Sequence, residues 1–333
     1  MDDRLRALEA WLRAVLRGAS PRLEPASADA SFRRYFRVYL ADGVTRIAMD
    51  APPEREDSSA FVRIAALFRG AGLNAPQVLE QDLAQGFLLL SDLGTLPYLK
   101  ALREGGSPES LFDAATTALV RWQAATRPGE LPPYDEALLR RELALFPDWY
   151  VARHLGVELT PAERESLERV FGAIVARNLA EPRVYVHRDY MPRNLMVSEP
   201  NPGILDFQDA VEGPISYDVA SLYRDAFISW EEERVLDGTI RYWEKARRAR
   251  LPVRDDFGEF WRDVEWMGLQ RHLKVLGIFA RLNYRDGKQG YLEDTPRFIA
   301  YVRHAVRRYH ELAPLGRLLD RLEGREPRVG YTF

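Results

Sequence analysis

The stretch VYVHRDYMPRNLMV (184–197) and the octet GILDFQDA (203–210) determine how the rest of the chain is interpreted. A polar turn containing Asp189 follows one apolar run, Asn194 lies five residues further on, and Asp206 ends the next apolar run. Both runs have the length and composition of short buried strands. Because acidic and amide side chains at the ends of such strands usually face a cleft, these residues predict a functional site.

The three side chains suit phosphoryl transfer. A carboxylate such as Asp189 can accept the proton of an attacking hydroxyl group. An amide oxygen and a second carboxylate, here Asn194 and Asp206, are hard oxygen ligands that suit Mg²⁺. The alternative is a hydrogen-bonded polar turn in an unrelated α/β protein. The length and order of the pattern H-x-D-x-x-x-x-N followed by D-F favour the catalytic interpretation.

The composition sets limits on the class of protein. The 333 residues are enough for two lobes with a sizeable core, and the formal net charge of -3 argues against nucleic acid as a partner. The absence of cysteine excludes disulfides and thiolate metal sites. The N-terminus lacks the apolar core of a signal peptide, and no apolar run is long enough to span a membrane. We therefore expect a cytoplasmic monomer without a membrane partner.

The hydrophobic pattern divides the chain into a mostly β part and a mostly α part. Residues 1–93 predict a helix near the N-terminus, a sheet of five strands, and one helix inserted at 58–71. The helical pattern of residues 94–333 is interrupted by the short strands of the motif at 184–210. Thr160, Pro161 and Glu163 form a capping box with a first-turn proline. We predict one lobe at 1–93 and a second lobe at 94–333. The family resemblance described below implies that the first lobe binds nucleotide and that the second is the catalytic, substrate-binding lobe.

Four motifs carry a resemblance to a known family. HRDYMPRN (187–194) and LDFQD (205–209) resemble the catalytic and metal motifs of the aminoglycoside phosphotransferase-like (APH/choline kinase) family. FLLLSDLG (87–94) resembles the hinge of these kinases, and GPISYDVASL (213–222) resembles the segment after the metal aspartate. The resemblance implies an α+β, bilobal protein-kinase-like fold, with a small β-rich N-lobe and a larger α-helical C-lobe.

Other segments resemble a narrower group. DASFRRYFRV (29–38), MDAPPE (49–54), LFPDWY (145–150) and QRHLKVLGIFARLNYRDGK (270–288) are similar to the AmgK-type anomeric sugar kinases. That group phosphorylates the C1 hydroxyl of N-acetylmuramate and N-acetylglucosamine in peptidoglycan recycling. The resemblance implies ATP and Mg²⁺ as cofactors and a small amino sugar as substrate. The alternatives are another acceptor (an aminoglycoside, choline or homoserine) or a non-catalytic pseudokinase module.

The resemblance assigns roles to the motif residues. It implies that Asp189 is the base close to the acceptor oxygen, and that Asn194 and Asp206 hold Mg²⁺ against the phosphates. It implies that His187 braces the loop backbone and that Asp218 anchors the catalytic turn from the following helix. For Asp218, the alternative is an ordinary acid in the first turn of a helix.

The resemblance also implies where the nucleotide lies. The backbone at Ser91 and Leu93 would meet the edge of the adenine. Apolar side chains of Ile47 and Leu205 would hold the two faces of the ring.

The chain departs from the family at the third strand. Met49 stands where a lysine usually holds the phosphates, and the helix after it, SSAFVRIAALFRGAG (58–72), has no acid to pair with such a lysine. We expect Ser31, Arg33 and Arg34 to contact the phosphates instead, because arginine binds phosphate oxygens bidentately. The alternative is that both arginines are solvated. The expectation predicts that Arg34→Ala raises the KM for ATP.

The acceptor pocket is expected in the helical lobe. A sugar needs hydrogen-bonding groups and an aromatic face, which Trp149, Tyr150, Arg271 and His272 could supply. Arg271 would suit the lactyl carboxylate of N-acetylmuramate. The alternative for each aromatic residue is core packing. Basic clusters such as RRAR (247–250) do not suit a polycationic aminoglycoside. The sequence leaves open the anomer and the preference between the two sugars.

Overall fold

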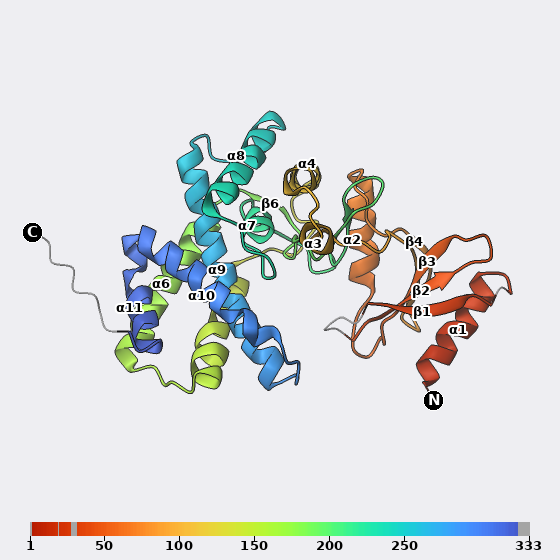
Figure 1. Cartoon of the computed structure of the whole chain (residues 1–333), viewed down its shortest axis with the longest axis horizontal. Helices are drawn as coiled ribbons and strands as arrows, with labels where there is room; N and C mark the ends of the chain where they lie inside the picture. The colour runs from red at the N-terminus through yellow and green to blue at the C-terminus, as the bar shows by residue number, and fades with distance from the viewer. Residues whose placement is uncertain (1, 19, 28–31, 326–333) are drawn as a thin grey trace, which may run out of the picture. The chain divides into compact units, whose positions relative to one another are not determined.

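The computed structural model describes residues 2–18, 20–27 and 32–325 and divides into two compact units (Figure 1). The first unit contains the residues up to Trp122 and also Pro192–Ala210, and the second contains Gln123–Met191 and the residues from Val211 onward. The predicted lobe boundary at residue 93 lies inside the first unit. The predicted class, a β-rich N-lobe and a helical C-lobe, is confirmed.

The first unit is built on an antiparallel sheet with strand order β1-β2-β3-β5-β4. Its strands are β1 (Arg22–Ser27), β2 (Arg34–Tyr39), β3 (Thr45–Asp50), β4 (Val78–Asp82) and β5 (Phe87–Ser91). Its helices are α1 (Asp3–Val15), α2 (Ser59–Gly70), α3 (Tyr98–Arg103) and most of α4 (Pro108–Ala124). The five strands and the inserted helix agree with the sequence prediction.

The two faces of the sheet have different partners. Leu8 and Leu12 of α1 pack with Val38 and Ala48, which lie on one face, as the position of α1 beside the strands in Figure 1 illustrates. Residues that alternate with them, such as Ile47, point to the opposite face because successive strand side chains point in opposite directions. That opposite face carries the cavity described below.

Two short strands complete the first unit. β7 (Leu195–Met196) pairs with β8 (Gly203–Ile204) in an antiparallel arrangement. The backbone N–H of Leu205 donates to the carbonyl of Asn194 at 2.9 Å. This pairing brings Asn194 and Asp206 together, although twelve positions separate them in the chain.

In the second unit, the long helix α9 (Phe257–Tyr284) packs against α5, α6, α7, α8, α10 and η1. The helices around it are α5 (Glu136–Leu145), the π-helical η1 (Phe146–His154), α6 (Pro161–Leu179), α7 (Tyr217–Tyr223), α8 (Glu232–Arg248), α10 (Thr295–Arg308) and α11 (Ala313–Leu322). Two 3-10 turns, η2 (Tyr291–Asp294) and η3 (His310–Leu312), flank α10. The capping box predicted for Thr160 and Glu163 is present at the start of α6.

The strand β6 (Arg183–Val186) pairs with β9 (Val211–Pro214) in the second unit. The polar turn that contains Asp189 begins directly after β6, and α7 follows β9. The paired strands therefore bring this turn close to α7 in the second unit. Among the residues that the structure describes, no helix is long and apolar enough to cross a membrane.

Candidate active site

A cavity of about 390 Å³ lies in the first unit on the sheet face opposite α1. Its lining includes six residues that the sequence assigned to nucleotide or metal: Ile47, Ser91, Leu93, Asn194, Leu205 and Asp206. Other lining residues were not singled out from the sequence, among them Tyr35, Arg37, Phe61, Pro76, Asp92, Met196 and Phe207. The fold therefore gathers the predicted apolar, hinge and metal residues around one hollow.

The segment after β5 offers main-chain groups to this cavity. The backbone N–H of Ser91 donates to the carbonyl of Gln77 at 2.9 Å, so this N–H is already used within the sheet. Arg37 holds the segment by donating to Asp92 at 2.7 Å and to the carbonyl of Gly94 at 2.9 Å. Burial opposes ionisation of Asp92, but the Arg37 guanidinium keeps the pKa of this carboxyl below its ordinary value.

Asn194 and Asp206 have the donor atoms and spacing of a magnesium site. Nδ2 of Asn194 donates to Oδ2 of Asp206 at 3.3 Å, and Gln208 donates to the other carboxylate oxygen at 2.9 Å. Adjacent Mg²⁺ ligands at about 2.1 Å from the ion lie about 3 Å apart, so a rotated Asn194 amide would fit beside Asp206. Asp206 has a φ of 61°, a left-handed conformation that non-glycine residues adopt rarely. These residues fit a divalent ion.

The position of the missing lysine is apolar. Met49 is fully buried in β3 and pairs with Tyr35 and Leu88 across the sheet. In α2, Phe61 packs on Phe207, with ring centroids 4.9 Å apart. Met49 therefore stands in apolar surroundings at the strand position where the family resemblance led us to expect a lysine. Such a replacement is stable because it removes a charge that would need desolvation.

The arginines expected to contact phosphate have other partners in the structure. Arg34 forms ion pairs with Asp50 and Asp2, and Asp50 belongs to the sheet face that α1 covers. Arg33 forms an ion pair with Glu56. Neither arginine is among the residues that line the cavity. Their role in phosphate binding stays a prediction, and Ser31 lies outside the described residues.

In the second unit, Asp218 binds the backbone of the catalytic turn. Its carboxylate accepts hydrogen bonds from the N–H of His187 at 2.7 Å and from the N–H of Arg188 at 3.0 Å. Nδ1 of the buried His187 accepts from the N–H of Asp189 at 3.2 Å. Arg188 has a φ of 76°, so these bonds hold a strained turn. Asp218 and His187 thus occupy the bracing positions expected from the sequence.

Burial raises the pKa of Asp218 to about 7, while the N–H groups of His187 and Arg188 and the charge of Arg271 oppose this rise. Asp189 belongs to the second unit, whereas Asn194 and Asp206 belong to the first. Four intervening residues of chain join the two parts of the motif.

A buried network around Glu142 was not predicted. Its carboxylate accepts from Arg188 at 2.6 Å and from Lys274 at 3.0 Å, and Tyr134 donates to it as well. Nζ of Lys274 also donates to the hydroxyl of Tyr217 at 3.2 Å. Burial alone would raise the pKa of Glu142, but the two cations hold that pKa below its ordinary value. The only signal in the sequence was an acid and a lysine on apolar helix stretches far apart in the chain.

The predicted acceptor residues lie in separate environments of the second unit. Arg271 is buried, with its Cζ 5.6 Å from the centre of the Tyr217 ring. Tyr150 lines a groove with α10, and Trp149 is half-buried in η1. His272 lines a small cavity and stacks near Tyr301, with ring centroids 4.8 Å apart. Arg271 is the member of the set that lies beside α7.

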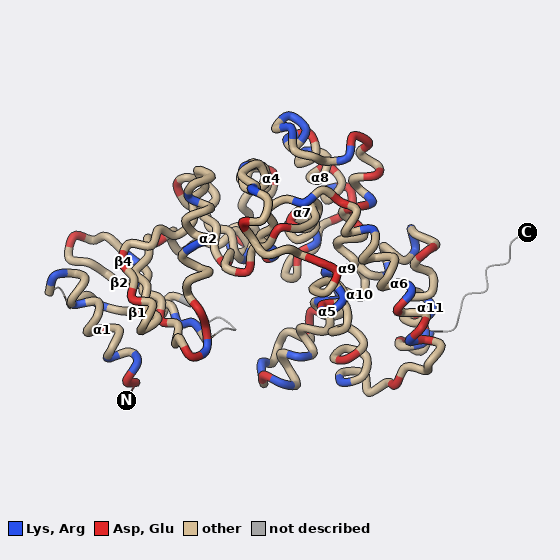
Figure 2. Tube along the Cα trace, turned by 180° about the vertical axis from the view of Figure 1, so that it is seen from behind, with Lys and Arg blue, Asp and Glu red and all other residues tan. Residues whose placement is uncertain are grey.

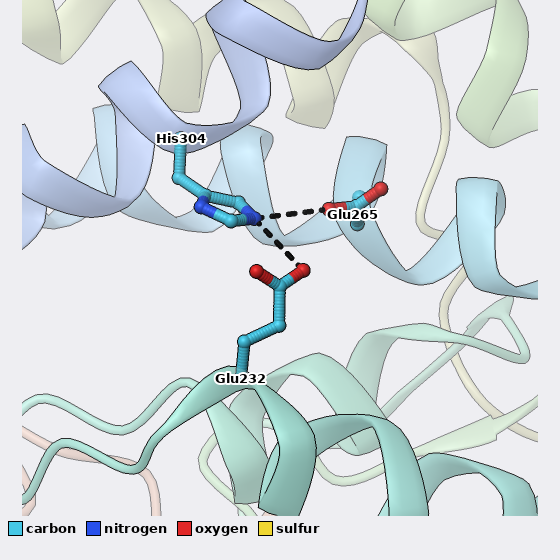
Figure 3. A group of neighbouring side chains, drawn as sticks. All are labelled: Glu232, Glu265 and His304. Carbon is cyan, nitrogen blue, oxygen red and sulfur yellow. Dashed lines mark hydrogen bonds and ion pairs between the residues drawn. The ribbon is translucent and has the colours of Figure 1, made fainter.

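The basic cluster RRAR (247–250) ends α8 and is exposed, as the blue stretch there in Figure 2 illustrates. It forms a solvated helix end. One further group of possible metal ligands occurs within the described ranges: Glu232, Glu265 and His304, from α8, α9 and α10 (Figure 3). Nε2 of His304 lies 3.1 Å from Glu232 and 3.7 Å from Glu265. Arg308 pairs with both carboxylates, so we interpret this group as an ion-pair cluster joining three helices.

Solved structures share this fold. The chain resembles an ethanolamine kinase of Plasmodium vivax with a TM-score of 0.64 and 11% identity, over 90% of this chain and 87% of that one. It resembles the GDP complex of aminoglycoside 2'-phosphotransferase-IIIa with a TM-score of 0.63 and 13% identity, over 91% and 99% of the two chains. At these identities the comparison establishes the fold, which is that of the kinase-like phosphotransferases.

Other relatives are much more similar to this chain in sequence than these solved structures are. Residues 22–254 match the family described as the phosphotransferase enzyme family, and the chain belongs to it. A protein of Pseudomonas aeruginosa named N-acetylmuramate/N-acetylglucosamine kinase is 53% identical, over 96% of this chain and 97% of the relative. A protein of Neisseria meningitidis serogroup B with the same name is 51% identical, over 98% of both chains.

Proposed function

We propose that the protein is an ATP- and Mg²⁺-dependent kinase of N-acetylmuramate and N-acetylglucosamine that phosphorylates the C1 hydroxyl. The supporting observation is the near full-length identity of 53% and 51% to two kinases that carry these sugar names. The family and the fold independently support phosphoryl transfer to a hydroxyl group of a small molecule.

The proposed reaction assigns one role to each part of the motif. Asp189 accepts the proton of the C1 hydroxyl as its oxygen attacks the γ-phosphorus of ATP, and the bond to the β–γ bridging oxygen breaks to release ADP. Asn194 and Asp206 would hold Mg²⁺, which neutralises charge on the phosphates. Asp218 keeps the turn in the strained conformation that directs Asp189.

The nucleotide is proposed to occupy the cavity of the first unit. The adenine would lie between the side chains of Ile47 and Leu205, with its edge at the main chain of Ser91 and Leu93. The carbonyl of Ser91 can accept a hydrogen bond from the adenine amino group. All four of these residues line the cavity, which supports the assignment.

Arg271 is proposed to distinguish the two sugars. N-acetylmuramate carries a lactyl carboxylate that N-acetylglucosamine lacks, and a buried guanidinium binds a carboxylate with a charge-assisted hydrogen bond. Arg271→Ala is expected to raise the KM for N-acetylmuramate about tenfold, with a smaller effect on N-acetylglucosamine. Steady-state kinetics with both sugars measure this ratio, and equal changes for both would contradict the assignment.

We propose that the enzyme acts in peptidoglycan recycling in the cytoplasm, where ATP is available. We also propose that the protein is a monomer. Size-exclusion chromatography with light scattering tests the oligomeric state.

The defining experiment offers the purified protein Mg²⁺-ATP and a panel of acceptors. The panel contains both amino sugars, an aminoglycoside, choline and homoserine. We expect ADP release with the two sugars only, together with loss of their reducing-sugar reaction, because a C1 phosphate blocks ring opening.

The other outcomes separate the alternatives. Turnover of a sugar with an intact reducing end would place the phosphate on another hydroxyl group. Preferred turnover of an amine acceptor would replace the proposed substrate class. Nucleotide binding without turnover of any acceptor would favour a pseudokinase module.

A further inference from the structure

The turn that contains Asp189 is anchored at two points by different elements of the second unit. Asp218, from α7, accepts hydrogen bonds from the backbone N–H groups of His187 and Arg188 at 2.7 and 3.0 Å. Glu142, from α5, accepts a hydrogen bond from the Arg188 side chain at 2.6 Å. The conformation of the turn therefore depends on how α5 and α7 are held relative to each other.

Lys274, from α9, contacts both of these elements. Its Nζ lies 3.0 Å from Oε1 of Glu142 and donates a hydrogen bond to the hydroxyl group of Tyr217 at 3.2 Å. Tyr217 directly precedes Asp218 at the start of α7. The lysine is buried. One ammonium group thus links the carboxylate that holds the Arg188 side chain to the helix that holds the backbone of the turn.

Neutralisation of Glu142 does not require Lys274. Without the lysine, the carboxylate of Glu142 would still accept from Arg188 on one oxygen and from the hydroxyl group of Tyr134 on the other. Arg188 alone would balance its charge. The burial of an ammonium group carries a large desolvation penalty. A second buried cation at a carboxylate that already has one therefore points to a role beyond charge balance.

The positive charge of Lys274 is maintained in spite of its burial. Burial lowers the pKa of this group, but the charge of Glu142, with a smaller contribution from Asp189, holds the pKa above its ordinary value. Lys274 is therefore a cation at neutral pH, and the carboxylate of Asp189 lies near enough to attract it.

We propose that Lys274 is a positioning residue for phosphoryl transfer. By joining Glu142 to Tyr217, it keeps the two anchors of the turn in one arrangement. The anchors in turn direct Asp189 towards the acceptor hydroxyl group. This inference rests on the proposed function, because it requires Asp189 to act as the base.

The test compares the steady-state kinetics of the parent and Lys274→Met, with Mg²⁺-ATP and N-acetylglucosamine as substrates. Methionine nearly keeps the length of the side chain and removes its charge and hydrogen bonds. Lys274→Met should lower kcat by about ten- to a hundredfold, because small displacements of a reacting group have effects of this size. The KM values for ATP and for the sugar should change less than about twofold, since the lysine touches neither substrate.

Arg177→Met is the matched control. Asp263, on the same helix as Lys274, pairs with Arg177 at 2.7 Å and with Arg254 at 2.9 Å. Arg177→Met therefore leaves a buried carboxylate with one cation, as Lys274→Met does, but in a different group of ion pairs. Its kcat should equal that of the parent when both variants are assayed well below their melting temperatures.

Tyr217→Phe tests the link to α7 without removing any charge, and it replaces Lys274→Met if that variant does not fold. Tyr217→Phe should lower kcat by about three- to tenfold, the effect of one lost hydrogen bond. In the double variant the two effects should not add, because both substitutions break the same contact.

Each of the other outcomes is decisive. A parent-level kcat in Lys274→Met and Tyr217→Phe would overturn the proposal and leave the kinase assignment intact. An equal fall of kcat in Arg177→Met would overturn it too, because the effect would then be a general loss of rigidity. A raised KM for the sugar at unchanged kcat would make Lys274 a substrate-binding residue instead. A parent protein that phosphorylates neither N-acetylglucosamine nor N-acetylmuramate would refute the proposed function itself.

Discussion

The cavity of the first unit and the catalytic turn of the second unit are stabilised by different interactions. Apolar side chains such as Ile47, Phe61 and Leu205 make up much of the cavity lining, and the buried Met49 stands at the strand position where a lysine was expected. The turn is instead held by buried carboxylates, Asp218 on its backbone and Glu142 on Arg188. The cavity is therefore shaped largely by apolar packing, whereas the strained turn is held by hydrogen-bond acceptors from other elements.

The largest expected difference concerns catalysis. Asp189→Asn should lower kcat by about 10²–10⁴-fold and leave nucleotide binding unchanged, because it removes only the proposed base. Asp206→Asn should instead lower the affinity for Mg²⁺, since it removes a proposed charged ligand. Steady-state kinetics at several Mg²⁺ concentrations, with nucleotide titrations, separate the two effects. Restoration of the Asp189→Asn rate by added Mg²⁺ would contradict the division of roles.

The next effect concerns stability. Glu142→Ala removes the partner of two buried cations, Arg188 and Lys274, and should lower the free energy of unfolding by about 3–5 kcal/mol. Glu136, an exposed acid on the same helix that pairs with Arg140, is the matched control. Glu136→Ala should change stability by less than about 1 kcal/mol. Denaturant unfolding measures both, and similar losses would show that the buried network is not the main constraint.

The smallest effect is a pH dependence in the second unit. Burial, aided by the charge of Asp263, raises the pKa of Glu181 to about 8, well above the ordinary value of 4.5. The folded state therefore binds this proton more tightly than the unfolded state. The resulting stabilisation is complete below the unfolded pKa and is lost as the pH rises through about 8.

The measurement is the melting temperature between pH 6 and 9, compared with Glu181→Gln. The variant keeps the shape of the side chain and cannot ionise, so its melting temperature should fall less over this range. Asp218, whose pKa burial raises to about 7, acts in the same direction and remains in both proteins. Equal slopes for the two proteins would contradict the buried, protonated state of Glu181.

Local patterns predicted the residues that lie close to one another in sequence. The alternation in β2 and β3, the capping box at Thr160, and the spacing from Asp189 to Asp206 each depend on neighbouring residues. Such patterns are readable because hydrophobic period and turn chemistry act over a few positions. The same locality let the sequence assign Asn194 and Asp206 to one site, since β7 and β8 are joined by a short segment.

Contacts between distant segments were not predictable in the same way. The partners of Arg34 are one example, because its position in the strand directs it to Asp50 on the α1 face of the sheet. The pairing of Glu142 with Arg188 and Lys274 joins three elements that are far apart in the chain. A charged residue on an apolar helix gives no indication of which distant charge it will meet.

The sequence by itself determined the kinase-like fold, the order of the motif residues and the absence of the third-strand lysine. The tertiary structure alone decided which arginines line the cavity and that the buried Glu142 pairs with Arg188 of the turn that contains Asp189. The physical reason is that the strength of a buried charge interaction depends on distance and desolvation in three dimensions. Neither quantity is encoded in the spacing of residues along the chain.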